Sequence, residues 1–342
     1  MGGIATVPDR PRAHINPLVL AWARRAAGYP RDEAARRIGV SSERLQTWES
    51  DEDRPTLRQL RLTAGVYKRP SALFYRSSPP VESLAVPDFR LLPKGETPYT
   101  PSLLYEIRRS FERRAIALEI ISEFREEPPT FPVEGHDLTP DRMARHIREI
   151  LGISLEVQFA WPEHYLALRT WTSAVESLGV LVFQVSNVKV PEMRGFSISE
   201  YPFPVIGLNG SDSPRGRIFT LIHELVHIML QQGGICDLHE AEVEANEPLE
   251  SYCNQTAAET LVPVSALLHE RPVIENELNP AWTDEKLQYL ANRFMLSQEV
   301  VLRRLLTLGR ATSAFKRSGP PAPPQTPQAP NSSAISQGPL PY

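Results

Sequence analysis

The segment LIHELVHIML, residues 221–230, constrains the fold of this chain more than any other stretch of its sequence. His223 and His227 stand at positions i and i+4, so on a helix both imidazoles project from one face, about one turn apart. Two ligands of one tetrahedral Zn²⁺ ion require this separation. A second stripe on the same helix is apolar and predicts burial against a core: Phe219, Ile222, Val226 and Leu230. The segment therefore predicts a buried helix that presents two histidines to a metal.

Glu224 follows the first histidine directly and lies about 100° further around the helix. From there its carboxylate reaches a metal-bound water without itself being a ligand. Zinc lowers the pKa of such a water to roughly 7, and a carboxylate that takes its proton lets the water attack a carbonyl. The pattern predicts a general base for amide hydrolysis. The alternative is an ordinary amphipathic helix whose histidines and glutamate bind nothing.

The third ligand of a catalytic zinc site must come from elsewhere, and the acidic stretch 237–263 offers several donors. We expect Glu250 to be the ligand, because it follows Pro248 at the start of a helix whose small residues, Ala257 and Ala258, allow close packing. Glu259 lies nine residues further on, which places it on the opposite side of that helix. Glu250 could also be only a helix N-terminal acid that suits the helix dipole. The remaining candidates more simply belong to a solvated loop: His239, Glu240, Glu242, Glu244 and Glu247.

These motifs together resemble one known family. RGRIFTLIHELVHIML followed by ESYCNQTAAETLVP is similar to the ImmA/IrrE zinc-dependent endopeptidases, in which an H-E-x-x-H helix precedes E-x-x-x-N-x-x-A-A-E-x-L-x-P. The resemblance covers roughly residues 160 to 270. It implies zinc ligands at His223, His227 and Glu250, with Glu224 as the general base. Members of the family cleave helix-turn-helix repressors and so switch on mobile-element or stress genes. Val226 departs from the pattern, since many members have glycine there.

The N-terminal region, residues 16–75, contains residues that cap and end helices at the spacing of a small helical bundle. Asn16, Ser41 and Thr56 are predicted N-caps, and Gly28 and Gly39 are predicted helix ends. The region resembles an Xre-type helix-turn-helix, with DEAARRIG as the second helix and ERLQTWE as the recognition helix. In such a domain polar residues near the start of the recognition helix read base edges and nearby arginines contact phosphates. The predicted DNA contacts are Ser42, Arg44 and Gln46 for bases, and Arg36 and Arg37, with Arg24 and Arg25, for phosphates.

The distribution of charged residues agrees only in part with DNA binding by the N-terminal region, which we call the head. Residues 1–78 contain 14 Lys and Arg against 8 Asp and Glu, while the rest of the chain contains 23 against 33. A basic head on an acidic body indicates that only the head could meet double-stranded DNA. Glu43 and the acids of ESDED, residues 49–53, lie where phosphate contacts would require positive charge. The head could instead recognise a protein, such as a repressor of the same fold, and the sequence leaves both open.

The order of the predicted elements indicates an α+β fold. A helical head precedes a zincin-like domain in which helices surround a small, mainly antiparallel sheet of strands at 180–186, 194–199 and 203–209. Helices are expected at 103–124, 139–152, 161–179, 215–232, 248–262 and 283–308. The predicted domains are an N-terminal arm (1–15), a helix-turn-helix domain (16–76), a proline-rich linker (77–102), a helical connecting region (103–159), a metallopeptidase domain (160–310) and a disordered proline-rich tail (311–342).

Composition excludes several classes of protein. The longest apolar runs are far shorter than the roughly 20 residues that cross a bilayer, so we expect no membrane contact. The N-terminal residues lack an apolar signal core, and Cys236 and Cys253 cannot form a disulfide framework, so we expect a cytoplasmic protein. The two cysteines are either small buried hydrophobes or, near the metal, a redox-sensitive pair or extra ligand. Histidine and carboxylate ligands accept Zn²⁺ and also Mn²⁺.

Two functions from different classes fit these features. The first is a regulatory zinc endopeptidase that cleaves a helix-turn-helix repressor and is targeted by its own head. The second is a DNA-binding regulator, or an antitoxin with a cognate toxin, whose zincin-like domain binds a partner without cutting it. A broad digestive peptidase fits poorly, because the sequence has neither an export signal nor a propeptide-like region.

Overall fold

The structure is a computed structural model that describes residues 11–80, 99–132, 138–232, 248–276 and 282–311, together with the backbone of 235–236. Within these residues helices predominate around one small sheet, which confirms the predicted α+β class. The predicted N-terminal arm, linker and tail fall largely on residues 1–10, 81–98 and 312–342, which lie outside the described residues. Among the described residues, no helix is both long and apolar enough to span a membrane.

The head consists of short helices that begin where the sequence predicts. They are α1 (Pro17–Ala26), α2 (Arg31–Ile38), α3 (Ser42–Glu49), α4 (Leu57–Tyr67) and the 3₁₀ helix η1 (Ser71–Tyr75). Asn16 and Ser41 accept hydrogen bonds from backbone N–H groups of the first turns of α1 and α3, and Thr56 forms a capping box with Gln59. Gly39 ends α2 in the left-handed conformation, with φ +81°.

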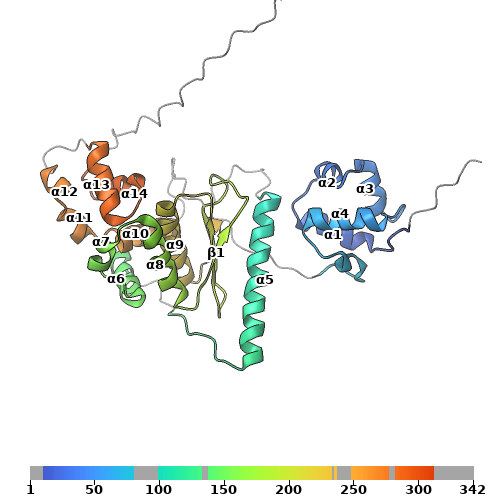
Figure 1. Cartoon of the computed structure of the whole chain (residues 1–342), viewed down its shortest axis with the longest axis horizontal. Helices are drawn as coiled ribbons and strands as arrows, with labels where there is room; N and C mark the ends of the chain where they lie inside the picture. The colour runs from blue at the N-terminus through green and yellow to red at the C-terminus, as the bar shows by residue number, and fades with distance from the viewer. Residues whose placement is uncertain are drawn as a thin grey trace, which may run out of the picture.

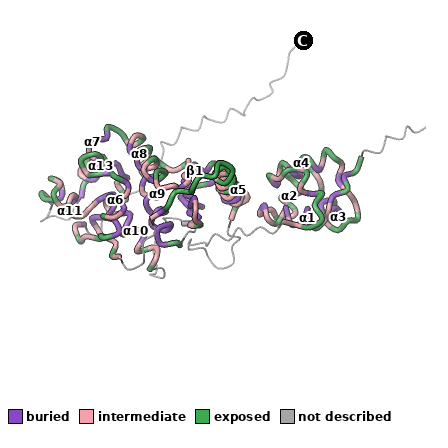
Figure 2. Tube along the Cα trace, turned by 90° about the horizontal axis from the view of Figure 1, so that it is seen from below, coloured by how far each residue is buried: buried purple, intermediate pink, exposed green. Residues whose placement is uncertain are grey.

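A compact apolar core holds the helices of the head together. Trp48 of α3, Tyr67 of α4 and Phe74 of η1 are almost fully buried, and they pack with small and branched residues of α1 and α2. Full burial of side chains of this size contributes about 2 to 3 kcal/mol each. The buried residues, purple in Figure 2, form one cluster inside the head and separate clusters inside the body of the molecule.

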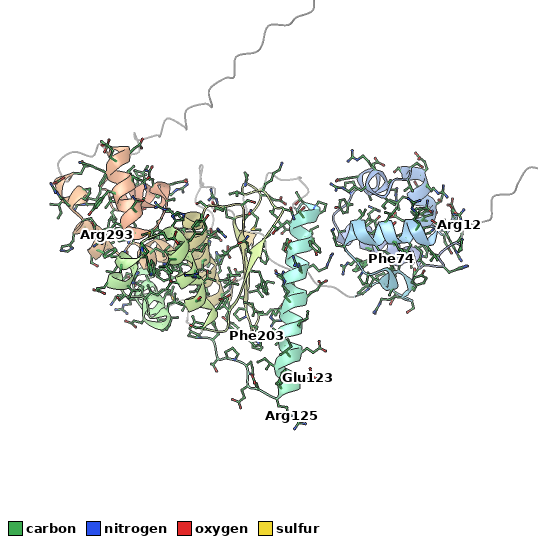
Figure 3. The ribbon with its side chains drawn as sticks, viewed as in Figure 1. Arg12, Phe74, Glu123, Arg125, Phe203 and Arg293 are labelled. Atoms are coloured by element: carbon green, nitrogen blue, oxygen red, sulfur yellow. The ribbon has the colours of Figure 1, made fainter. Side chains whose placement is uncertain are left out.

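A long helix, α5 (Pro101–Phe124), lies between the head and the sheet (Figure 1). Its first turns bury Leu103 and Ile107 against the strands. On the other side, Arg108 Nη2 donates a hydrogen bond of 2.8 Å to the carbonyl oxygen of Lys68 at the end of α4. Further along, Arg114 Nε donates at 3.1 Å to the carbonyl of Phe203, which Figure 3 shows beside α5.

The sheet contains four strands in the order β1-β3-β2-β4, with bounds β1 (Leu181–Val185), β2 (Gly195–Ile198), β3 (Val205–Asn209) and β4 (Ile235–Cys236). β2 pairs antiparallel with β3 and with β4, which confirms the mainly antiparallel prediction. β1 pairs parallel with β3, which lies between β1 and β2 and runs opposite to β2. The short β4 was not predicted.

Helices cover the far side of the sheet and extend to the C-terminal end of the described chain. They are α6 (Pro140–Leu151), α7 (Leu155–Ala160), α8 (His164–Glu176), α9 (Pro214–Met229), α10 (Pro248–Leu261), α11 (Val264–Leu268), α12 (Arg271–Glu275), α13 (Asp284–Phe294) and α14 (Gln298–Thr307). The helical stretch predicted at 283–308 is interrupted, because Met295 adopts φ +59° and Ser297 caps a new helix. The helices α7, α11 and α12 were not predicted.

α9 lies at the centre of this body, with β2 and β3 on one side and α8 and α10 on the other. Every residue of α9 from Thr220 to the helix end is buried. Of the expected apolar stripe, Ile222, Val226 and Leu230 are buried and Phe219 is partly buried against the same core. The other sides of the helix are also covered, by β2 around Glu224 and by Glu250 of α10 around the histidines. A helix that is buried all round can hold polar side chains only where other groups satisfy them.

Candidate metal centre

The two histidines of α9 face each other inside the body of the molecule. Ser213 caps the helix through the N–H of Gly216 at 3.0 Å, and the helix then runs unbroken through both residues. The Nε2 atoms of His223 and His227 lie 3.0 Å apart, and both side chains have no exposed surface. Spacing of i and i+4 thus brings two ring nitrogens to one point, as the sequence predicts.

Glu250 approaches this point from the first turn of α10. Its Oε2 lies 3.3 Å from His223 Nε2, and its Oε1 lies 3.1 Å from His227 Nε2. One ligand atom from each of the three residues lies within 4.8 Å of the others, so the cluster could hold a metal ion. The structure therefore brings together the three residues that the sequence proposes as ligands. The competing donors His239, Glu240, Glu242, Glu244 and Glu247 lie outside the described residues.

The electrostatics of the cluster favour a cation. Burial alone would raise the pKa of Glu250, but hydrogen bonds from His223 and His227 outweigh burial and lower it. Burial alone would lower the pKa of His227, but hydrogen bonds with Cys253 and Glu250 outweigh burial and raise it to about 11. A buried site that attracts protons this strongly is one where a bound metal ion can replace them. The Nδ1 atom of His227 lies 3.1 Å from the carbonyl oxygen of Gln232, to which it donates, so Nε2 is left for a metal.

Glu224 lies beside the histidines but faces the sheet. Its side chain has no exposed surface, and its Oε2 accepts a hydrogen bond of 2.7 Å from the hydroxyl of Ser197 on β2. Burial raises the pKa of Glu224, although the neighbouring histidines and Ser197 oppose the shift. A carboxylate with a raised pKa accepts a proton more readily near neutral pH. Sequence reasoning did not find Ser197, because only strand register places it here.

Polar side chains from three helices, two of them buried and one partly buried, hold the far end of α10. Arg148 of α6 donates to the carbonyl oxygen of Thr260 at 2.7 Å, and Gln158 of α7 donates to that of Leu261 at 3.0 Å. Arg304 of α14 donates to the carbonyl of Val262 at 3.2 Å. These bonds satisfy carbonyl groups that a helix end leaves without partners, and so they fix the helix that carries Glu250. No sequence motif marks them.

Two other residues singled out from the sequence find a structural explanation. Glu259 pairs with Arg304 and accepts from the N–H of Val264, which agrees with its predicted position away from the metal ligands. Cys253 is buried and carries a free thiol whose pKa is raised by burial. Its contact with His227 places it next to the cluster. Nothing is described for the side chain of Cys236, whose backbone pairs with Gly195.

Of the predicted DNA-contacting residues, Arg36, Arg37, Ser42, Arg44 and Gln46 belong to α2 and α3, and Arg24 and Arg25 belong to α1. Arg36 and Gln46 are exposed. Arg37 pairs with Glu33 at 2.9 Å, yet half of its side chain remains exposed. Arg44 lies 3.7 Å from Asp53, and Ser42 is hydrogen-bonded to Asp32. Arg25 is also exposed, whereas the prediction for Arg24 is wrong, because its side chain is mostly buried in an ion pair with Glu49.

The acidic residues at the end of the recognition helix α3 and just after it are largely neutralised within the head. Glu49 is only 6% exposed and binds Arg24 at 2.7 Å and Arg31 at 3.4 Å. Asp53 pairs with Arg12 at 3.0 Å. Asp51 pairs with Arg54 at 3.5 Å. These pairs weaken the sequence-based argument that the block repels phosphate.

Comparison with known families agrees with both parts of this description. Residues 175–306 match the model of the peptidase M78 family described as an IrrE N-terminal-like domain. Residues 20–74 match a helix-turn-helix model. No curated protein matches the chain. The chain therefore contains an N-terminal region similar to helix-turn-helix domains, followed by a region similar to the IrrE N-terminal-like domain of peptidase M78.

Proposed function

We propose that this protein is a regulatory zinc endopeptidase that cleaves a helix-turn-helix repressor. The observation that carries the proposal is the convergence of His223, His227 and Glu250 on one buried point, with Glu224 next to the first histidine on the same helix. Two imidazoles and one carboxylate form the ligand set of many hydrolytic zinc sites. The match to a peptidase family supports the same conclusion.

Each residue has a distinct role in the proposed reaction. His223, His227 and Glu250 hold the ion, which supplies Lewis-acid activation of a water molecule and of the scissile carbonyl when bound. Glu224 accepts a proton from the attacking water and passes it to the leaving amide nitrogen. Its buried position raises its pKa and so suits it to both transfers. Mn²⁺ could take the same ligands, so the identity of the ion is part of the proposal.

The presence of the head supports a specific regulatory substrate rather than a broad range of substrates. A helix-turn-helix domain in the same chain as a peptidase domain delivers the site either to DNA or to a protein bound there. A repressor of the same fold, bound at a nearby operator, would then meet the metal site at high local concentration. The resemblance to the ImmA/IrrE peptidases supports this choice of substrate.

A Glu224→Gln variant tests the proposal. The purified, zinc-loaded chain is incubated with the helix-turn-helix repressor encoded nearest to its gene, and intact repressor is followed by mass spectrometry. We expect cleavage to fall by about 100-fold or more, because general-base catalysis contributes at least this much. Bound zinc, measured by elemental analysis, should stay unchanged, since Glu224 is not among the three ligands. Undiminished cleavage by the variant would show the mechanism to be wrong.

The match to a helix-turn-helix domain favours a second candidate, a DNA-binding regulator or antitoxin that binds a partner without cutting it. The same experiment separates the two functions. If the zinc-loaded wild-type chain leaves the repressor intact but binds the promoter of its own gene, the second candidate replaces the first. Formation of a stable complex with a neighbouring toxin would identify the partner.

A further inference from the structure

The carboxylate of Glu224 lies against β2, a strand that carries no proposed metal ligand. Ser197 of β2 is fully buried, and its hydroxyl donates to Glu224 Oε2 at 2.7 Å. Gly195 stands two residues earlier on the same strand, and a Cβ atom at this position would lie 2.9 Å from Glu224 Oε1. Residues i and i+2 of a strand share one face. The two small residues thus form the surface on which the carboxylate rests.

α9 alone does not determine where the carboxylate of Glu224 points. A helix fixes the direction of the Cα–Cβ bond, but the side-chain torsions beyond this bond can still vary. The last torsion of a glutamate is broadly distributed. The two histidines have fewer torsions, and they meet Glu250 at the cluster. Glu224 is not a member of that cluster. Its orientation therefore requires a contact from another element.

We propose that Ser197 is a positioning residue, whose hydroxyl selects the orientation in which Glu224 acts as base. The hydrogen bond, at 2.7 Å, has the usual length of an O–H···O bond and lies within the range for a carboxylate acceptor. Both partners are buried, so water does not compete for the bond. The inference deepens the proposed function and rests on it, because it presupposes that Glu224 is the base.

The test compares Ser197→Ala, which removes the hydroxyl, with Ser197→Thr, which retains it. Ser110→Ala serves as a matched control, because Ser110 is a similarly buried serine on α5, outside the candidate site. For each zinc-loaded protein we measure kcat and KM for repressor cleavage and the affinity for zinc. A crystal structure of each protein reports the position of the Glu224 carboxylate, a readout that does not depend on activity.

We expect Ser197→Ala to lower kcat about tenfold, because one hydrogen bond to a charged group is lost. KM and zinc affinity should stay unchanged, since Ser197 is not one of the proposed ligands. In the crystal structure the carboxylate should leave its wild-type position. Ser197→Thr should restore both kcat and the position, and Ser110→Ala should change neither.

Two results would overturn the inference: a carboxylate that keeps its wild-type position in Ser197→Ala, or a threonine variant as impaired as the alanine variant in kcat and carboxylate position. Failure of the proposed function looks different. If the wild-type chain cleaves no repressor, the peptidase proposal fails, while the crystal structures still show whether Ser197 orients Glu224. If Ser197→Thr does not fold, the alanine structure alone decides between the outcomes.

Discussion

Single residues in the head show that a charge counted in the sequence is not always a charge at the surface. Glu49 belongs by sequence to an acidic block, yet in the fold it is a buried partner of Arg24. The hydrogen bond with Glu49 raises the pKa of Arg24 further above its usual value. The pair thus ties α3 to α1 and is absent from the surface that would face phosphates.

Replacement of Glu49 by Gln should destabilise the head by about 3 kcal/mol, because it leaves Arg24 buried without its charge partner. Urea unfolding followed by circular dichroism measures the loss. Glu43→Gln is the matched control on the same helix, where the side chain is exposed and a much smaller change in stability is expected. Equal stability of the two variants would show that the buried pair contributes nothing.

At the candidate site, the sequence predicted the residues whose relative positions are set within a single helix. His223, Glu224 and His227 lie within one helix, so their relative positions follow from its period of 3.6 residues per turn. Glu250 could be chosen because the start and the period of its helix were both evident in the sequence. Ser197 and Gly195 could not be found in this way, because their contact with α9 depends on strand pairing between residues far apart in the chain.

Among the elements, α10 has its two ends in different surroundings. Glu250 lies in its first turn, and three side chains bind the carbonyl groups at its other end. Burial lowers the pKa of Arg148 to about 10, and its guanidinium also donates to Gln158 at 3.0 Å. The position of a proposed metal ligand therefore depends on contacts made at the opposite end of its helix.

Arg148→Met should lower the free energy of unfolding by about 2 kcal/mol, because the carbonyl oxygen of Thr260 would lose a charged donor while the apolar volume is largely kept. Chemical unfolding of the zinc-loaded chain measures this change. Arg145→Met on the same helix is the control, since Arg145 is 69% exposed and pairs only with Asp141. A loss of equal size in both variants would contradict a specific role for Arg148.

The accuracy of the predicted elements depended on their length and on their end signals. The long helices α5, α6, α9 and α10 were predicted close to their observed bounds because proline and capping residues mark their starts. The helices α7, α11 and α12 have only five or six residues, too few to show a period. The break at Met295 was missed because a methionine at positive φ gives no sequence signal.

In the whole molecule, α5 lies between the helix-turn-helix domain and the peptidase domain, and it contacts the helix-turn-helix domain. Arg108 of α5 binds the end of α4, and a Cβ atom at Gly28 would contact Leu104 of α5. Figure 1 shows the head at one end of the molecule and the C-terminal helices at the other. α2 and α3, which carry the predicted DNA contacts, belong to the end that is furthest from the metal cluster.

If the head binds DNA, affinity for promoter fragments of its own gene should fall steeply with salt. Arg36→Gln should reduce the slope of log affinity against log salt by about 1, because one phosphate contact is lost. Fluorescence anisotropy over a salt series measures the slope. Arg145→Gln, which changes an exposed arginine outside the head, should leave it unchanged. Absence of binding at low salt would assign the head to protein recognition.

The burial of the site has a kinetic consequence. His223, Glu224 and His227 have no exposed surface, and only Glu250, at 20%, reaches the outside. A peptide cannot touch a base that solvent cannot touch, so each cleavage would have to wait for the surroundings of α9 to rearrange. Access of the substrate to the proposed base would then depend on how often that happens. A proposed enzyme whose site is closed between encounters is poorly suited to degrading many molecules, but it is sufficient to remove a few copies of one repressor.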